Sequence, residues 1–396
     1  MSDATATTTP LLDAIVEHLD IPRSYYEKAV ARHKSLGEWL CRPESKIAVF
    51  EPHVSPQGSF RYGTVVRPLQ STDEYDLDNV AKLAVTKTAM TQRQLKGLYG
   101  AEVKAYARSN GMLAPVEEKN RCWRLRYADD VAFHLDTLPC VPEDTSLIQG
   151  LVSRGVSPEL AALAVAITDK RHPRYDQITR DLLSSNPRGF ARWFETRARE
   201  VAMPRMRRLV ERRLYASVEE VPPYEWKTPL QTSIQILKRH RDVMFRDDPD
   251  AGPISMLITN LAAHAYEGET DLALALTNIV DRMPRFVNPT RPRAPNPAHP
   301  GEDHADKWAN NPALEQNFWL WLTQVKADVA KLSSSIGTRR VDADVQAAFR
   351  VELTADELRT FGAPPPSVAP TFVSVTPVVR IPSAPRPWGI GHRSRS

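Results

Sequence analysis

The chain has 396 residues, of which 42% are hydrophobic and 25% are charged, a composition typical of a soluble globular protein. That length favours two domains, or one divided domain with appendages, and a formal net charge of +4 is too small for a general nucleic-acid coat, although it allows a local basic cleft. Cys41, Cys122 and Cys140 fit neither a disulfide framework nor a zinc site, and without signal-peptide or membrane-spanning patterns we expect a cytoplasmic protein that contacts no membrane.

The first half of the chain is predicted to contain a sheet. Residues 11–21 and 24–40 space their apolar side chains by three and four, which predicts two amphipathic entry helices. Short stretches rich in β-branched or aromatic residues follow and predict strands. The predicted strands are residues 47–52, 62–66, 75–83, 122–127 and 131–138, with a helix at 91–108 between them.

From about residue 157 onward the pattern is helical. The predicted helices are residues 158–170, 189–202, 229–245, 254–266, 270–283 and 313–332. A sheet-containing half followed by a helical half predicts an α+β protein with a cleft between the halves. A Pro/Asn-rich excursion at residues 285–303 interrupts the helical half, as either a binding loop or a surface wrap.

An Arg-rich segment and a proline-rich segment are predicted to lie on the surface without a catalytic role. The Arg-rich stretch 191–214 is interspersed with Glu195, Glu200 and Glu211, which favours a salt-bridged exposed helix over a nucleic-acid surface. Prolines recur from Gly362 to the end, which predicts an extended, mobile tail.

The stretch 75–83 carries Asp76 and Asp78, separated by one residue. Side chains alternate along a strand, so both carboxylates point to one face and repel each other unless a cation lies between them. Asp136, in the later stretch 131–138, supplies a third carboxylate if the two strands are neighbours. Hard oxygen ligands suit magnesium, and three carboxylates are enough for two ions. The plain alternative for an isolated pair is two exposed carboxylates on a polar face.

A Gly-Ser turn precedes the aspartates. Gly58 lets the backbone approach an oxyanion, and the hydroxyl of Ser59 can donate to phosphate oxygens. Together with the three aspartates, this turn indicates catalysis on a nucleotide triphosphate. His134 alternates to the same face as Asp136 and could reach the site, although a single histidine is more often structural.

These motifs resemble a known family over roughly residues 20–345. QGSFRYGTVVRP, EYDLDNVAKL, HLDTLP, PLQTSIQILKRHRDVMF and ISMLITNLAAHAYEGE are similar to the bacterial CD-NTases, relatives of cyclic GMP-AMP synthase. The resemblance implies a polymerase beta-like nucleotidyltransferase core with a mixed sheet, joined to a helical oligoadenylate-synthase-like domain. The implied parts are N-terminal helices packing on the core at 1–45, the core at 46–215, the helical domain at 216–355 and a flexible tail at 356–396.

The resemblance also implies roles for the site residues. Asp76, Asp78 and Asp136 would be catalytic and bind two Mg2+ ions, with Mn2+ as a substitute, and Gly58 and Ser59 would bind phosphates. Lys238 matches the helical lysine directed at the donor triphosphate, and Ser255 the serine that assists it. The plain alternative for Lys238, within LKRHRD, is a solvated basic face.

The implied activity is synthesis of a cyclic di- or trinucleotide messenger in CBASS anti-phage signalling. The substrates would be ATP, with GTP or pyrimidine triphosphates as further candidates, and the product would reach a downstream effector. An accessory regulator could bind the tail, and no nucleic acid would be obligatory. The alternative is a template-independent nucleotidyltransferase that acts on RNA or a small acceptor, and a catalytically silent nucleotide-binding scaffold is a second one.

Overall fold

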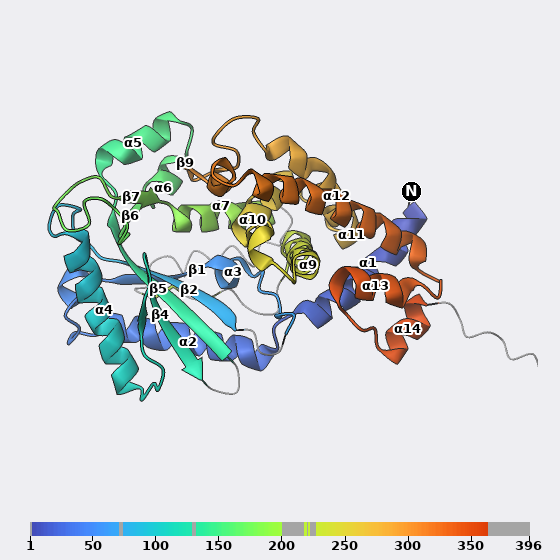
Figure 1. The fold of residues 1–396 in the computed structure, drawn as a ribbon, viewed down its shortest axis with the longest axis horizontal. Helices are drawn as coiled ribbons and strands as arrows, with labels where there is room; N and C mark the ends of the chain where they lie inside the picture. The colour runs from blue at the N-terminus through green and yellow to red at the C-terminus, as the bar shows by residue number, and fades with distance from the viewer. Residues whose placement is uncertain are drawn as a thin grey trace, which may run out of the picture. The chain divides into compact units, whose positions relative to one another are not determined.

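A mixed sheet of seven strands forms the N-terminal half in the computed structural model, which describes residues 2–70, 74–128, 132–199, 218–219, 221 and 227–362 (Figure 1). Its strands are β1 (His53–Gln57), β2 (Tyr75–Lys82), β3 (Glu117–Glu118), β4 (Trp123–Ala128), β5 (Ala132–Pro142), β6 (Val165–Ile167) and β7 (Leu183–Ser185). The order is β1-β2-β5-β4-β3, and β6 pairs with β5 and β7. Strands β2 and β5 are parallel, whereas the other pairs are antiparallel.

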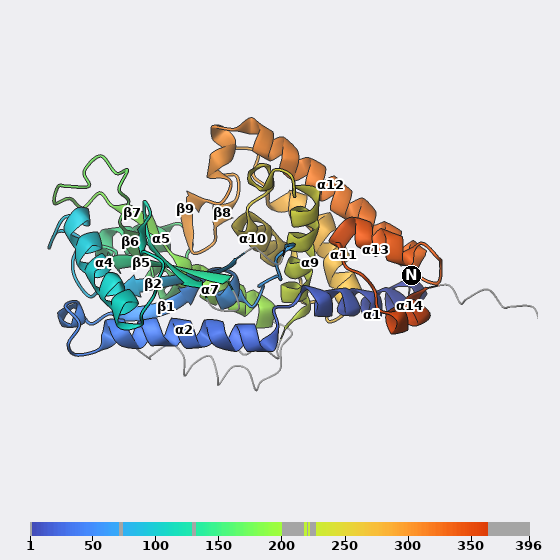
Figure 2. The same cartoon turned by 60° about the horizontal axis from the view of Figure 1, so that its bottom comes forward.

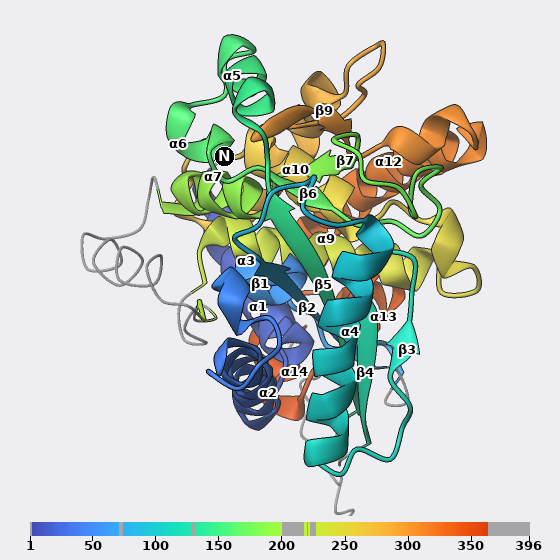
Figure 3. The same ribbon diagram turned by 90° about the vertical axis from the view of Figure 1, so that its left-hand side faces the viewer.

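Helices α2 (Arg23–Cys41) and α4 (Gln92–Ser109) pack on one face of this sheet (Figure 3). The apolar side chains of the central strands point to this face, where Leu77 and Leu135 are buried in the same core cluster. Because strand side chains alternate, the neighbours of these leucines point to the opposite face. That face is therefore free to carry polar residues.

The C-terminal half is helical, with a separate apolar core. Its helices are α7 (Pro187–Arg199), α9 (Pro229–Met244), α10 (Ser255–Ala265), α11 (Leu272–Arg282), α12 (Pro312–Ser335), α13 (Val341–Phe349) and α14 (Ala355–Phe361). Helix α1 (Ser2–Leu19) packs against α9, α11 and α12, and its buried side chains belong to the core of the helical half (Figure 2). The domain boundaries stay a prediction.

The start of α9 is well defined, because Thr228 and Gln231 form a reciprocal capping box and Pro229 occupies the first turn. The Gln231 side chain also donates to the backbone oxygen of Tyr62, at 2.8 Å. The helix is thereby fixed against the segment that follows the Gly-Ser turn, which determines where its polar face lies.

Most predicted elements are confirmed. Both entry helices, the strands at 75–83, 122–127 and 131–138, and the helix at 91–108 are present, as are the helices that begin near 189, 229, 254, 270 and 313. Helix α7 is described only to Arg199, where Glu195 pairs with Arg199 at 3.1 Å. The rest of the Arg-rich stretch lies outside the described residues.

The predicted strand at 62–66 is wrong. Residues up to Tyr62 belong to the short helix α3 (Gly58–Tyr62), and Thr64 and Val65 have no strand partner among the described residues. Side chains of α9 donate hydrogen bonds to the backbone oxygens of Thr64 and Val65 instead. Gln235 donates to Val65 at 2.6 Å, and Lys238 donates to Thr64 at 3.1 Å. The β-branched residues therefore form an extended strap and not a strand.

Two more predictions from apolar runs are wrong. Residues 47–52 contain the 3-10 helix η1 (Ala48–Phe50), because Phe50 bonds back to Ile47, and the strand starts later, at His53. In the stretch 158–170 only α6 (Pro158–Ala161) is helical, and Val165–Ile167 forms β6. A short buried apolar run has no periodicity that separates helix from strand.

The remaining differences concern segments that were predicted to be irregular. The Pro/Asn-rich excursion contains a hairpin of β8 (Pro295–Asn296) and β9 (His299–Asp303). The predicted flexible tail begins too early, because α14 has a Thr354–Glu357 capping box and buries Phe361. Residues 363–396 lie outside the described residues. Within the described part of the chain, none of the helices has the length and apolarity needed to cross a membrane.

Candidate active site

The three aspartates that the sequence singled out lie together on the polar face of the sheet. Asp76 and Asp78 point away from Leu77, and the parallel register places Asp136 directly beside Asp78. One carboxylate oxygen from each residue lies within 4.8 Å of those of the other two. The condition that the sequence could not test, adjacency of the two strands, is met.

This cluster concentrates negative charge in a poorly solvated place. Burial, with added repulsion from Asp76 and Asp136, raises the pKa of Asp78 to about 8. A carboxyl group in such surroundings stays ionised at neutral pH only if positive charge is supplied. The donor set is made of hard oxygens, so the three aspartates could hold a divalent metal ion.

Basic side chains support two of the aspartates. Arg124, paired with Asp136 across strands β4 and β5, donates to both of its carboxylate oxygens at 2.7 Å. His134 places one ring nitrogen 2.9 Å from Asp76 and the other 2.9 Å from Glu74. Burial lowers the pKa of His134, but the hydrogen bond and charge of Asp76 outweigh this effect, so its pKa is raised overall. Both aspartates are therefore held in fixed orientations.

The Gly-Ser turn lies against the acidic cluster. Gly58 adopts the left-handed conformation, with φ of +62°, and Ser59 lines the neighbouring cavity. A Cβ atom on residue 58 would lie 2.4 Å from Oδ2 of Asp78. Only glycine allows this approach, so the turn and the aspartates form one unit.

We expect the substitution Gly58→Ala to lower activity at least about tenfold, because the new methyl group displaces Asp78 from its position. The control is Gly155→Ala. Gly155 also has a positive φ, of +89°, but no described atom lies within 4 Å of a Cβ there. It therefore bears the backbone strain of about 1–3 kcal/mol without touching the site. Initial rates and melting temperatures of both variants are the measurements, and equal rates would contradict the assignment.

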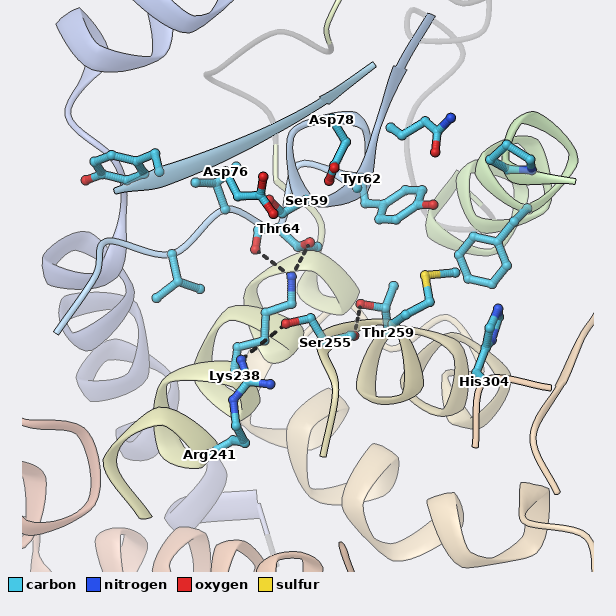
Figure 4. A pocket seen from close by; sticks show the side chains of 18 of the residues that line it. Ser59, Tyr62, Thr64, Asp76, Asp78, Lys238, Arg241, Ser255, Thr259 and His304 are labelled. Carbon is cyan, nitrogen blue, oxygen red and sulfur yellow. Dashed lines mark hydrogen bonds between the residues drawn. The ribbon is translucent and has the colours of Figure 1, made fainter. Parts of the chain in front are cut away.

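Lys238 reaches the site from the opposite wall, which α9 provides. Its ammonium group donates to the backbone oxygen of Thr64 at 3.1 Å and to the Thr64 hydroxyl at 3.0 Å (Figure 4). Burial, reinforced by the charge of Arg241, lowers the pKa of Lys238 to about 7. The interpretation as a solvated basic face is wrong, because only 5% of Lys238 is exposed.

Ser255 lies beside Lys238, at the first turn of α10. Its hydroxyl accepts a hydrogen bond of 3.2 Å from Arg241, which follows Lys238 by one turn of α9. Arg241 was not predicted from the sequence. Its spacing of three residues from Lys238 was a usable signal, since such residues share a helix face.

A cavity of about 510 Å3 connects these groups. Its lining includes the Gly-Ser turn, Asp76, Asp78, Lys238 and Ser255, and also Ser185, Phe190, Asn296, Glu302 and His304. A second cavity of about 600 Å3 shares Glu74, Arg241, Asp242, Ser255 and His304 with the first. No individual residue of the 285–303 excursion was predicted to be functional, although Asn296 and Glu302 line the cavity.

This arrangement defines a class of protein, because clustered carboxylates facing a Gly-Ser turn and a lysine are suited to transfer at a triphosphate. Residues 52–139 match the family described as cyclic GMP-AMP synthase DncV-like, nucleotidyltransferase domain. The match contains the Gly-Ser turn and all three aspartates. The protein is an enzyme, a nucleotidyltransferase.

Longer comparisons relate the chain to the bacterial CD-NTases. It is 26% identical to a c-di-GMP synthase of Roseivirga ehrenbergii, over 85% of this chain and 82% of that protein. It is also 26% identical to the cyclic dinucleotide synthase CdnG of Bradyrhizobium diazoefficiens, over 78% and 72%.

Solved structures show the same fold. The Bradyrhizobium diazoefficiens CD-NTase CdnG in complex with GTP matches with a TM-score of 0.62 and 21% identity, over 86% of this chain and 95% of that one. The Vibrio cholerae DncV cyclic AMP-GMP synthase with a linear intermediate matches with a TM-score of 0.51 and 15% identity, over 90% and 88%. The predicted fold class is confirmed.

Proposed function

We propose that this enzyme joins nucleoside triphosphates into a cyclic di- or trinucleotide and releases pyrophosphate. The observation that carries the proposal is the cluster of Asp76, Asp78 and Asp136 beside one cavity, which Asp76 and Asp78 line together with Ser59 and Lys238. The adjoining second cavity supports it, because cyclisation requires two nucleotides side by side. The names of the related proteins, which are cyclic dinucleotide synthases, support it as well.

We assign the metal site to Asp76, Asp78 and Asp136, and their hard oxygen donors fit Mg2+, with Mn2+ as a substitute. Two bound ions would neutralise the triphosphate and lower the pKa of the attacking ribose hydroxyl. We further assign to Arg124 the task of holding Asp136 in place for these contacts.

The other residues position the substrate. Ser59 and Lys238 would donate to the triphosphate of the donor nucleotide, with Arg241 and Ser255 behind them. The ribose hydroxyl oxygen of the acceptor would form a bond to the α-phosphorus while the bond to the bridging oxygen breaks and pyrophosphate leaves. Asp136 would orient this hydroxyl or take its proton. A second transfer within the linear product would close the ring.

The biological setting is part of the proposal. We infer a role in CBASS anti-phage signalling, in which the cyclic product activates a downstream effector. We also propose a cytoplasmic location, with which the lack of a disulfide among Cys41, Cys122 and Cys140 in the described part of the chain agrees. Binding of an accessory regulator to residues 363–396 stays a prediction.

The test is mass spectrometry of the products formed from ATP, GTP, CTP and UTP with Mg2+ and no added acceptor. The proposal requires a product that resists both phosphatase and an exonuclease, because a ring has no terminal phosphate and no free end. A strict requirement for RNA, or phosphatase-sensitive linear products alone, would favour the alternative of a transferase that acts on RNA or a small acceptor.

A further inference from the structure

One part of the first cavity is lined by residues of the β8–β9 hairpin, which belongs to the helical half, and of strand β7, which belongs to the sheet. Asn296 and Glu302 belong to the β8–β9 hairpin, His304 directly follows it, and Ser185 ends β7. These polar side chains do not contact the acidic cluster or Lys238, and the transfer step described above does not use them. Their presence in the cavity needs another reason.

Glu302 is the central residue of this group. Its two carboxylate oxygens accept hydrogen bonds from the Ser185 hydroxyl at 2.9 Å and from the Asn296 amide at 2.7 Å. Within the described residues, no lysine, arginine or histidine forms an ion pair with it. A carboxylate held by two neutral donors keeps unused lone pairs, and here it lines the cavity.

Aromatic rings line the same cavity as this carboxylate. Phe190 is fully buried and packs edge to face against Tyr62 and His304, with ring centroids 5.4 Å and 5.5 Å apart, and all three residues line the cavity. His304 is 8% exposed, yet its Nδ1 has no hydrogen-bond partner among the described residues. Aromatic faces beside unsatisfied polar atoms are the combination that proteins use to stack a nucleobase and read its edge.

We propose that this part of the cavity binds the base of the nucleotide whose triphosphate lies over Ser59 and Lys238, and that Glu302 selects guanine. The proposal rests on the nucleotide binding in the proposed function. Guanine presents two adjacent donors, N1–H and the N2 amino group, which match the two oxygens of a carboxylate. Adenine and cytosine each place a ring-nitrogen acceptor beside the amino group, and uracil flanks its single donor with two carbonyl oxygens. Such an acceptor would face the negative charge of Glu302.

The substitution Glu302→Gln tests the proposal. A glutamine amide can still donate to the Ser185 hydroxyl and accept from Asn296, so both hairpin contacts can be kept. Toward the cavity it offers one donor and one acceptor, which complement the adenine edge directly, whereas guanine can meet them only through O6 and N1–H and then leaves its N2 amino group without a partner. The matched control is Glu267→Gln, because Glu267 is exposed and lines neither cavity.

The measurement is binding of α,β-methylene analogues of GTP and ATP to the full-length protein by calorimetry with Mg2+, because these analogues cannot be transferred. We expect the wild type to bind the guanine analogue at least about tenfold more tightly, and Glu302→Gln to reduce that ratio by about tenfold or more. Glu267→Gln should leave the ratio unchanged. Equal or tighter binding of the adenine analogue by the wild type would overturn the proposal, and so would an unchanged ratio in folded Glu302→Gln.

The ratio of the two affinities in the wild type is measured without any variant. The proposal can therefore be contradicted even if Glu302→Gln fails to fold. The binding assay also requires no product. Selective guanine binding together with linear products would contradict cyclisation alone, whereas cyclic products together with unselective binding would contradict the role of Glu302 alone.

Discussion

Replacing Asp76 and Asp78 together by asparagine will lower the rate of product formation at least about a thousandfold, because the substitution removes the charge that neutralises bound metal ions at the triphosphate. Mass spectrometry of the products measures the loss. The matched control is Asp356→Asn on α14, because the Asp356 side chain is 82% exposed and neither it nor its ion-pair partner Arg359 lines either cavity, and this variant should keep the wild-type rate.

The same variant separates loss of chemistry from loss of folding. The carboxylates of Asp76 and Asp78 repel each other and Asp78 is buried, so asparagines should leave the melting temperature of the metal-free protein equal or higher. Added Mg2+ or Mn2+ should raise the melting temperature of the wild type but not of the variant. Undiminished product formation by the double variant would end the proposed function.

The second large effect is expected for Lys238→Met, which keeps the length of the side chain and removes its charge. A charged hydrogen bond to phosphate contributes about 1.5–3 kcal/mol, so kcat/KM should fall about tenfold to a hundredfold. Lys34→Met is the control, because Lys34 is 69% exposed and lies on α2, away from the cavity. Equal kcat/KM values for wild type and Lys238→Met would contradict the role of this lysine.

Lys238 also predicts a pH dependence of stability. Its pKa is about 7 in the folded protein and about 10.4 in an unfolded chain, so between these values the unfolded state binds one more proton. The free energy of unfolding of the nucleotide-free protein therefore rises with pH across this window. This gain in stability is lost again as the pH falls toward 7. Lys238→Met should lack this contribution, and urea unfolding at pH 7 and pH 9.5 measures the difference.

The core of the site could be predicted because its signals are local. Two aspartates with one residue between them share a strand face wherever that strand lies, and Gly58 occupies a turn that requires a positive φ. Long helices such as α9 and α12 carry enough turns for their period to be clear. These features do not depend on distant parts of the chain.

The missed features depend on contacts between segments far apart in sequence. The Thr64–Val65 strap has the composition of a strand, but its hydrogen-bond partners are Gln235 and Lys238, about 170 residues later. No motif in the sequence marks Arg124 or Arg241 as functional. Only the fold places Arg124 beside Asp136 and Arg241 beside Ser255. The position of Glu302 could not be predicted either, because it depends on the hairpin crossing to β7.

That crossing has a mechanical consequence. Ser185 is bonded to Glu302 and Ser184 to His299, so the sheet and the helical half are fastened together at this margin. An opening of the cleft at this margin would therefore have to break both hydrogen bonds, together with the one that the Asn186 side chain donates to the backbone oxygen of Ala298.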